Sequence, residues 1–381
     1  MNSEINVGIV ADWLVTYAGA EKVIAEFIEL FPEAELYSVI DYLSENNRAL
    51  LKNKKAKTTF IQKLPKAKKL YQKYLPIMPL AIEQLDVSKH NIVLSSSHAV
   101  AKGILTGPDQ LHISYVHSPI RYAWDLQHQY LNESGLNKGV KSFLIRYMLH
   151  KIRMWDCRTA NGVDFFIANS EFISRRIKKI YGRNADVIYP PVDTSKFIFK
   201  ENKDDYFLTA SRLTPYKRVD LIVEAFNHMP NKKLVVIGDG PEMKKIRGLA
   251  KSNIEILGYQ SDERMREYMQ NARAFIFAAE EDFGISPVEA MSCGTPVIAY
   301  GKGGALETVI PLGNEKASGI FFREQNYRSL ISAVNEFENN RYAILPLDCH
   351  SNAIRFSKER FRDELDKYIK EKWSLFNSNR R

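Results

Sequence analysis

The sequence has few cysteines and no long apolar run. Its 381 residues include three cysteines, Cys157, Cys293 and Cys349, whose scattered positions show no metal-ligand spacing. We therefore expect reduced thiols and a cytoplasmic location. No uninterrupted apolar segment approaches the roughly 18 residues of a membrane-spanning helix. The first apolar segment, INVGIVADWLV, follows Glu4 and contains Asp12, so it is typical of a first strand and not of a signal peptide.

Acidic residues are absent from one long segment. Residues 46–82 hold Arg48 and nine lysines without any Asp or Glu, a formal charge of +10, whereas the whole chain carries +9. The rest of the chain is close to neutral, with 44 basic and 45 acidic residues. A lysine-rich segment is most often a solvated face. The uneven distribution nevertheless predicts one basic patch on a near-neutral protein.

Apolar residues accompany these charges in two segments. The first contains KAKKLYQKYLPIMPL, and residues 137–158, NKGVKSFLIRYMLHKIRMWDCR, mix basic and apolar side chains in a helix-compatible run. Such helical segments are typical of surfaces that lie on anionic lipid. The sequence has no zinc-finger spacing and no RNA-binding aromatic motif. We expect segments 46–82 and 137–158 to contact an anionic membrane surface and not nucleic acid, with a merely solvated face as the alternative.

Strands and helices alternate along both halves of the chain. From about residue 206, YFLTAS, KLVVIG, IEILG and RAFIFAA predict strands separated by amphipathic helices. This pattern predicts a parallel sheet covered on both faces. The N-terminal half starts in the same way, with NVGIVAD before a helix that has one apolar stripe, and NIVLSSS, LHISYVHS and DFFIANS predict its later strands. The stripe comprises Val23, Ile24, Phe27, Ile28 and Phe31.

A proline-marked break, YPPVDTSKF at 189–197, separates the two halves. We expect residues 1–190 to form an N-terminal Rossmann-like domain and residues 191–352 a C-terminal one. Residues 353–381 should form a charged helix, for which packing against the N-terminal domain is one option. The predicted class is α/β, with two doubly wound domains that face a central cleft. Ligands of such sheets bind outside the carboxyl ends of the strands.

Two cations follow the first strand of the C-terminal half. Arg212 comes directly after YFLTAS, and Lys217 lies five residues later at a helix start. Arginine offers a planar fork to phosphate oxygens and lysine offers a mobile point charge. Either residue alone would most often be an ordinary surface cation. Together, beside a helix N-terminus, they predict a diphosphate clamp.

The segment EEDFGISPVEAMSCGTPVIA, residues 280–299, places Glu281 and Glu289 eight positions apart. Gly284 would let the backbone amides of Phe283, Ile285 and Ser286 approach an anion closely. Glu281 would then face what is attached to the phosphates, and a carboxylate suits sugar hydroxyls.

A purely structural interpretation of Glu289 is also open. Ser286 would be an N-cap, Pro287 the first helical residue, and Glu289 the partner in a capping box. Gly294 and Pro296 would end that helix, and Val297–Ala299 would form a buried strand.

In the N-terminal half, Gly19 lies between the first strand and the first helix, and His117 ends LHISYV. A plain turn glycine and a structural histidine are the ordinary alternatives, but a histidine at a strand end is a functional-site candidate. The first strand does not lead to GxGxxG, which argues against an NAD-dependent Rossmann enzyme. The sequence contains no Asp-x-Asp and no His/Cys cluster suited to a metal.

Taken together, these motifs resemble the retaining glycosyltransferases of family 4, which have the GT-B fold. The Glu-x7-Glu element, EAMSCGTPVIA, SRLTPYKRVD, VVIGDGPE and PPVDTSKF carry the resemblance over nearly the whole chain, and the C-terminal motifs are highly specific as a set. YVHSPIRYAWDL, residues 115–126, is also similar to bacterial mannosyltransferases of O-antigen and related surface-polysaccharide assembly.

The resemblance implies a role for each candidate. Arg212 and Lys217 would neutralise the departing diphosphate, Glu281 would hold donor-sugar hydroxyls, and Glu289 would accept the ribose hydroxyls. The amides of Phe283, Gly284, Ile285 and Ser286 would lie near the phosphates and sugar. His117 would hydrogen-bond the donor sugar, Gly19 would approach the diphosphate, and Tyr259 would lie near the base. Many relatives have paired glycines where this chain has Ala18 and Gly19.

The resemblance further implies retention of anomeric configuration, no divalent metal and no other cofactor. We expect a cytoplasmic mannosyltransferase that uses GDP-mannose and a lipid-linked oligosaccharide at the inner membrane face. A UDP-sugar donor is the first alternative, because no residue identifies the base. The second is a non-catalytic sugar-nucleotide or membrane-binding protein.

Overall fold

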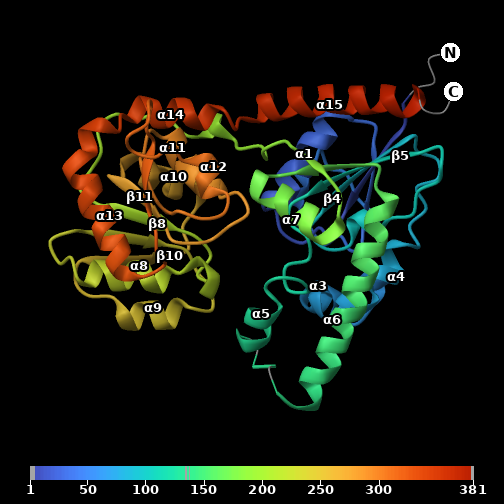
Figure 1. The fold of residues 1–381 in the computed structure, drawn as a ribbon, viewed down its shortest axis with the longest axis horizontal. Helices are drawn as coiled ribbons and strands as arrows, with labels where there is room; N and C mark the ends of the chain where they lie inside the picture. Colours follow the sequence, from blue (N-terminus) through green and yellow to red (C-terminus); the bar gives the residue numbers. More distant parts are fainter. Residues whose placement is uncertain (1–4, 134, 137, 379–381) are drawn as a thin grey trace. The chain divides into compact units, whose positions relative to one another are not determined.

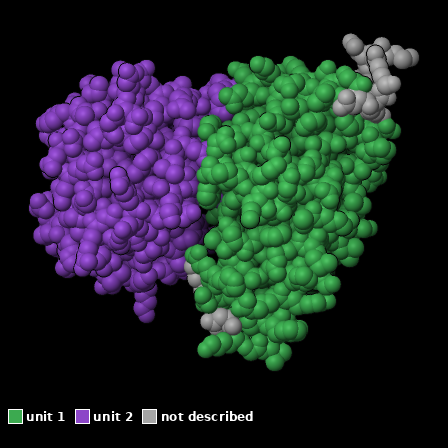
Figure 2. Space-filling view, in the orientation of Figure 1, with its two compact units in different colours: residues 1–190, 361–381 green, residues 191–360 purple. Residues whose placement is uncertain are grey.

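The computed structural model describes residues 5–133, 135–136 and 138–378, which divide into two compact units (Figures 1 and 2). Unit 1 comprises residues 1–190 and 361–381, and unit 2 comprises residues 191–360. Each unit is built on its own parallel sheet. Within the described ranges, no helix is both long enough and apolar enough to cross a membrane.

Unit 1 contains a seven-stranded sheet in the order β3-β2-β1-β4-β5-β6-β7. All neighbouring strands pair in parallel. The strand order reverses between β1 and β4, so their carboxyl ends flank the position where doubly wound sheets bind ligands. The strands are β1 Val7–Ala11, β2 Glu35–Ser38, β3 Lys57–Thr58, β4 Ile92–Ser97, β5 Leu111–Val116, β6 Phe165–Ala168 and β7 Ala185–Val187.

The helices of unit 1 begin with α1, Gly19–Leu30, whose predicted apolar stripe lies in the core except for the partly buried Phe31. A long helix, α6, forms at Gly139–Thr159, within the basic and apolar segment 137–158 and one residue beyond it. The other helices are α2 Glu45–Ala49, α3 Ala67–Leu70, α4 Met78–Ile82, α5 Gln127–Glu133 and α7 Glu171–Tyr181, with the 3-10 helices η1 Phe60–Lys63, η2 Tyr71–Ile77, η3 Ala101–Gly103 and η4 Ala160–Gly162.

Unit 2 contains a six-stranded parallel sheet in the order β10-β9-β8-β11-β12-β13. The strand order reverses between β8 and β11. Four of the strands coincide with the segments predicted from sequence, and β12 coincides with the predicted buried strand after the Glu-x7-Glu element. The strands are β8 Phe207–Ala210, β9 Leu234–Ile237, β10 Ile254–Gly258, β11 Ala274–Phe277, β12 Val297–Tyr300 and β13 Gly319–Phe322.

Helices connect the strands of unit 2 and cover its sheet (Figure 1). Short 3-10 turns, η5 Thr194–Lys196, η6 Pro215–Lys217 and η7 Arg341–Ala343, lie in the connections. The helices are α8 Val219–Asn227, α9 Met243–Leu249, α10 Asp262–Asn271, α11 Ile285–Ser292, α12 Ala305–Thr308, α13 Tyr327–Asn340 and α14 Pro346–Ile354.

The C-terminal tail is not one helix from residue 353. Helix α14 continues to Ile354, and α15 begins at Lys358. Arg355 and Phe356 form a turn between the two helices, and Ser357 makes a short parallel bridge with Val192, whose amide donates to the carbonyl of Phe356 at 2.9 Å. Helix α15 runs to Ser378, and it contributes buried residues, Phe361, Leu365 and Ile369, to the core that α1 also lines.

Candidate functional site

The carboxyl ends of β8 and β11 bring two predicted residues into contact. Lys217 lies in η6 after β8, and Glu281 lies in the loop after β11. Their side chains form an ion pair, and each is largely buried. The pair therefore lies where the strand order of unit 2 reverses. A cation and an anion at this position suit a ligand that has an anionic group and hydroxyls.

The loop after β8 also carries Arg212, whose side chain is exposed. Its backbone is fixed by the neighbouring loop after β9. Leu213 accepts from the amide of Glu242 at 3.0 Å and donates to the carbonyl of Asp239 at 2.9 Å. A Cβ on Gly240 would lie 2.4 Å from the carbonyl oxygen of Leu213, so only glycine allows this approach. The segment VVIGDGPE therefore shapes the loop that presents Arg212.

Helix α11 begins earlier than expected, so Ser286 is not its N-cap. The N-cap is Gly284, with φ of 87°, and Ile285 is the first helical residue. Glycine adopts this left-handed conformation without a steric cost, and it turns the chain into the helix before Ser286 is reached. Pro287 falls third in the first turn, where its missing N–H removes no helical hydrogen bond.

The capping box predicted for Glu289 does not exist, because Glu289 is the fifth residue of α11. The N-terminus has no side-chain cap. The amides of Ile285 and Ser286 therefore precede the first intrahelical donors and point out of the helix end. Backbone donors and the helix dipole both favour an anion there. Phe283 is buried, and its ring packs edge-on against Phe356.

Two glycines after β12 support the Glu281 loop, and the sequence reasoning missed them. The amide of Gly304 donates to the carbonyl of Glu281 at 2.8 Å. A Cβ on Gly303 would lie 2.3 Å from the carbonyl oxygen of Glu281. A Cβ on Gly304 would lie 2.3 Å from the Cα of Phe283. The glycine cluster in AYGKGGALE, directly after a predicted strand, is the signal that could have identified them.

Tyr259 follows the edge strand β10 and is 77% exposed. It lies at the same edge of the sheet as Lys217 and Glu281, because the strands are parallel. Two strands, β9 and β8, separate β10 from β11. The contact of Tyr259 with a base therefore stays a prediction.

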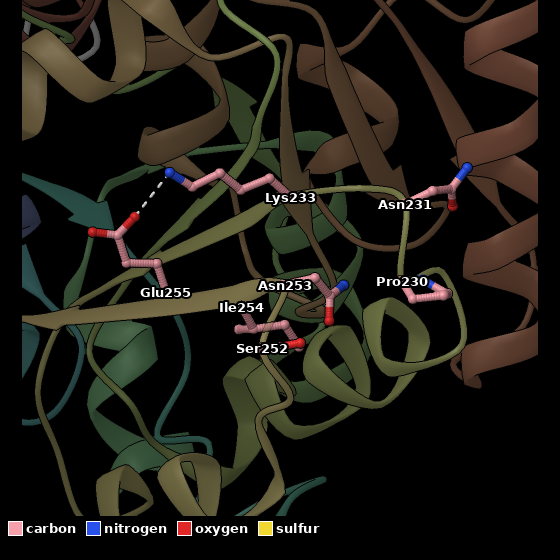
Figure 3. Close-up of a pocket in the computed structure, with 7 residues that line it drawn as sticks. All are labelled: Pro230, Asn231, Lys233, Ser252, Asn253, Ile254 and Glu255. Carbon is pink, nitrogen blue, oxygen red and sulfur yellow. Dashed lines mark ion pairs between the residues drawn. The ribbon is translucent and has the colours of Figure 1, made fainter.

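A shallow pocket lies at the opposite ends of the strands (Figure 3). Its lining includes Lys233, which pairs with Glu255 at 3.0 Å, and Asn253, whose amide donates to three backbone carbonyls. These residues precede or begin β9 and β10. The polar groups are thus engaged with the protein, and the amino ends of parallel strands are not where such sheets bind ligands. We assign no role to this pocket.

In unit 1, His117 lies directly after β5 and is partly exposed. Its Nε2 lies 2.8 Å from the Ser96 hydroxyl, and Asn169 donates to its carbonyl at 3.0 Å. Burial lowers its pKa to about 3, and the neighbouring charge of His98 adds to this effect. The imidazole is therefore neutral at physiological pH, which suits a hydrogen bond to a hydroxyl.

His98 and Asp12 form a second group that the sequence reasoning missed. Asp12 follows β1 and is buried, and it accepts four backbone hydrogen bonds of 2.6–3.0 Å from residues 98–101. His98 Nδ1 lies 2.9 Å from Asp12. Burial lowers the pKa of His98, but the attraction and hydrogen bond of Asp12 outweigh it and raise the pKa overall. An aspartate directly after the first strand and the sequence SSSHAVA, which spans the end of β4, were the available signals.

Gly19 is the first residue of α1. The preceding amide, of Ala18, donates to the buried carboxylate of Glu21 at 2.9 Å. Burial raises the pKa of Glu21. The Glu21 carboxyl thus occupies one amide at this helix end, and the approach of Gly19 to a diphosphate stays a prediction.

No group of three or more His, Cys, Asp or Glu side chains is arranged to hold a metal ion in the part of the chain that the structure describes.

Known proteins resemble the chain in sequence. Residues 192–356 match the family described as Glycosyl transferases group 1. An uncharacterised glycosyltransferase of Methanocaldococcus jannaschii is 30% identical over 51% of this chain and 55% of its own length. The O-antigen chain mannosyltransferase RfbU of Salmonella typhimurium is 25% identical, over 46% of this chain and 49% of its own length. The GDP-mannose-dependent monoacylated alpha-(1-6)-phosphatidylinositol monomannoside mannosyltransferase of Corynebacterium glutamicum is 28% identical, over 39% of this chain and 47% of its own length. The chain thus spans about half the length of the curated relatives it matches.

Solved structures resemble the chain over nearly its whole length. Anabaena HepE, crystallised with UDP, matches with a TM-score of 0.71 and 16% identity, over 96% of this chain and 100% of that one. The pneumococcal O-GlcNAc transferase GtfA, in complex with UDP and GlcNAc, matches with a TM-score of 0.61 and 13% identity, over 97% of this chain and 99% of that one. The expected class is thereby confirmed: the chain has the two-sheet fold of the GT-B glycosyltransferases, and its residues 192–356 match the glycosyl transferases group 1 family.

Proposed function

We propose that the protein is a retaining glycosyltransferase that moves mannose from GDP-mannose to a lipid-linked oligosaccharide. The acceptor would belong to O-antigen or another bacterial surface polysaccharide, at the cytoplasmic face of the inner membrane. The observation that carries the proposal is the Lys217–Glu281 pair at the strand reversal of unit 2, beside the uncapped N-terminus of α11. The names of RfbU and the Corynebacterium enzyme support the sugar and the nucleotide.

The donor would separate the two charges of the pair. Lys217 would turn to the diphosphate together with Arg212, and Glu281 would accept from sugar hydroxyls. The amides of Ile285 and Ser286 would stabilise the phosphate next to the breaking bond. Glu289 would accept the ribose hydroxyls. The amides of Ile285 and Ser286 would act without reorganisation, because Gly303 and Gly304 fix the loop that precedes them.

In the proposed reaction, the bond between the sugar C1 and the diphosphate oxygen breaks as the acceptor oxygen bonds C1 from the same face. The acceptor proton passes to the departing phosphate oxygen. The negative charge that develops there is met by Arg212 and Lys217, so we propose that no divalent metal is needed. The other candidates keep the roles that the resemblance implies. His117 would contact the sugar, Gly19 the diphosphate and Tyr259 the base.

Ligand-induced stabilisation tests the donor. Thermal unfolding is followed with GDP, GDP-mannose, UDP-glucose, UDP-N-acetylglucosamine, ADP and NAD, each with and without EDTA. A ligand at about 100 times its Kd adds roughly 2.7 kcal/mol to the free energy of unfolding. Stabilisation by GDP and GDP-mannose, unchanged by EDTA, supports the proposal. Stabilisation by a UDP-sugar instead would overturn the mannosyl assignment, and no response to any nucleotide would favour a non-catalytic membrane-binding protein.

A further inference from the structure

Helix α6 has two different faces. Ser142, Leu149, Ile152 and Asp156 are buried, and their spacing of three, four and seven places them on one side. Val140, Phe143, Leu144 and Tyr147 follow the same spacing on the opposite side, and they are 78%, 70%, 53% and 54% exposed. We call these four residues the outer stripe. A core-facing helix normally has polar residues at these positions, so packing within unit 1 does not account for them.

The inner face of α6 is firmly anchored. Lys102 forms a buried ion pair with Asp156 at 2.8 Å, and Trp124 Nε1 and the Tyr181 hydroxyl donate to the same carboxylate at 2.7 and 2.9 Å. Leu149 and Ile152 pack in a core cluster with Ile120 and Ala123. Beyond this anchor, the helix extends past the end of its sheet (Figure 1). The outer stripe is thus carried by a helix whose inner face is packed against the rest of unit 1.

Positive charge surrounds the outer stripe. Lys138 and Lys141 at the start of the helix and Lys151 further along it are exposed. Residues 138–155 contain no Asp or Glu. Two copies of such a surface would repel each other, whereas an anionic surface would attract it. The combination of exposed aromatic and aliphatic residues with flanking lysines is the pattern of interfacial helices.

The predicted basic segment 46–82 divides into two parts. Its first part is largely neutralised by acidic neighbours, so the full charge of +10 is not presented to solvent. Arg48 pairs with Asp41, Lys52 with Glu29 and Lys57 with Glu35, at 2.7–2.8 Å. In its second part, Lys63, Lys66, Lys68, Lys69 and Lys73 are exposed, and the described residues offer them no ion pair.

This second part lies next to α6. Leu75 of η2 packs in the same cluster as Leu149 and Ile152. Trp155 of α6 packs against the same core cluster as Tyr71 and Tyr74, and its indole N–H donates to Glu83 at 2.7 Å. Two segments some 70 residues apart in sequence therefore pack against each other in unit 1, and the unpaired lysines lie on the segment that contacts the inner face of α6.

We propose that the outer stripe docks on an anionic lipid bilayer, with Phe143 and Leu144 inserted at the boundary between headgroups and acyl chains. Lys141 and Lys151 of the same helix would contact the anionic headgroups. The proposal rests on the proposed function only for the identity of the membrane, since a lipid-linked acceptor would place the enzyme there.

Vesicle flotation tests the proposal without any sugar transfer. Full-length protein is mixed with phosphatidylcholine vesicles with and without phosphatidylglycerol, at low and high salt. We expect binding only to the anionic vesicles, reduced by salt. The Phe143→Ser/Leu144→Ser variant should lose at least tenfold in the partition coefficient, and Lys141→Gln/Lys151→Gln about fivefold per lysine. The matched control Ile198→Ser/Leu347→Ser, at positions in unit 2 that are 72% and 61% exposed, should bind like the wild type.

A fluorescence measurement separates insertion from simple attraction. Phe143→Trp should show a blue shift on addition of anionic vesicles, whereas Leu347→Trp should not. Equal vesicle binding by the wild type and the Phe143→Ser/Leu144→Ser variant, or no shift for Phe143→Trp, would overturn the proposal. Absence of vesicle binding together with a dimer in solution that Phe143→Ser/Leu144→Ser dissociates would assign the stripe to a second copy instead. Nucleotide-induced stabilisation is measured without lipid, so failure of docking leaves the donor proposal standing.

Discussion

Lys217 is ion-paired with Glu281 across the point where the strand order of the second sheet reverses. If the two residues serve opposite ends of a donor, their replacements should have different effects. Lys217→Ala should weaken GDP binding about tenfold or more, because a charged hydrogen bond to phosphate is worth about 1.5–3 kcal/mol. Glu281→Gln should bind GDP at least as well as the wild type, since it leaves the ammonium unpaired, but should lose sugar transfer. Calorimetric titration with GDP and GDP-mannose measures both.

The chain offers a matched control for this pair. Lys233 is paired with Glu255 at 3.0 Å, at the amino ends of the strands (Figure 3). Lys233→Ala should change GDP affinity by less than about 0.5 kcal/mol, since exposed ion pairs contribute little. Equal losses in Lys217→Ala and Lys233→Ala would show that a general loss of positive charge, and not a specific phosphate contact, weakens the nucleotide complex.

Gly304 should not tolerate a side chain. A Cβ at this position would lie 2.3 Å from Phe283 Cα and 2.6 Å from the carbonyl oxygen of Asp282, so the Glu281 loop would have to move. Gly304→Ala should lower the free energy of unfolding by about 1–3 kcal/mol, as other overpacked sites do, and should also weaken donor binding. Denaturant unfolding and GDP titration measure the two effects.

Gly248 provides the control for this substitution. It lies in α9, and a Cβ there would meet nothing within 4 Å. Gly248→Ala should be neutral or stabilise by about 0.4–1 kcal/mol, because alanine reduces the entropy of the unfolded chain. A Gly304→Ala variant as stable and active as Gly248→Ala would show that the Glu281 loop does not depend on this close approach.

The sequence predicted the periodic elements of the fold better than the details of its turns. Buried parallel strands are apolar runs between helices of 10–15 residues, so most strands of both sheets were predictable. The start of α11 was not, because Ser286 and Pro287 carry the usual N-terminal signals while a left-handed Gly284 starts the helix earlier. The support of Glu281 by Gly304 depends on a contact between loops that are distant in sequence.

Contacts distant in sequence also explain what was missed in the first unit. Asp12 binds the backbone of residues 98–101, more than 80 positions away, and no local pattern indicates this. The basic patch was overestimated for the same reason. The sequence shows that residues 46–82 lack acids, but not that Asp41, Glu29 and Glu35 fold back onto Arg48, Lys52 and Lys57.

The buried Lys102–Asp156 pair should be costly to break from one side. Both side chains are buried, and burial lowers the pKa of Lys102 despite the attraction of Asp156. Lys102→Met should lower the free energy of unfolding by about 3–5 kcal/mol, since it leaves a buried carboxylate without its cation. Lys102→Met/Asp156→Asn should recover part of this loss, because the neutral amide still accepts from Trp124 or Tyr181. A double variant as unstable as the sum of the single ones would contradict the pairing.

His117 and His98 should affect the pH dependence of stability in opposite directions. The folded-state pKa of His117 is about 3, mainly because of burial, whereas an unfolded histidine titrates near pH 6.5. Between these values the unfolded chain binds more protons, so this residue makes stability fall as the pH falls below about 6.5. The pKa of His98 is raised by Asp12 over the opposing effect of burial, so its contribution is present below about pH 6.5 and is lost as the pH rises through its folded-state pKa.

Substitution separates the two contributions. His117→Gln should flatten the loss of stability between about pH 6.5 and pH 4, and the remaining slope should come in part from His112, whose pKa burial lowers to about 4. His98→Gln should leave that acid limb in place and remove the decline above about pH 6.5. Urea unfolding of the three proteins across this range gives the slopes directly. An acid limb that His117→Gln leaves as steep as in the wild type would mean that the folded-state pKa of His117 is not lowered from its unfolded value, so burial would not keep the imidazole neutral below about pH 6.5.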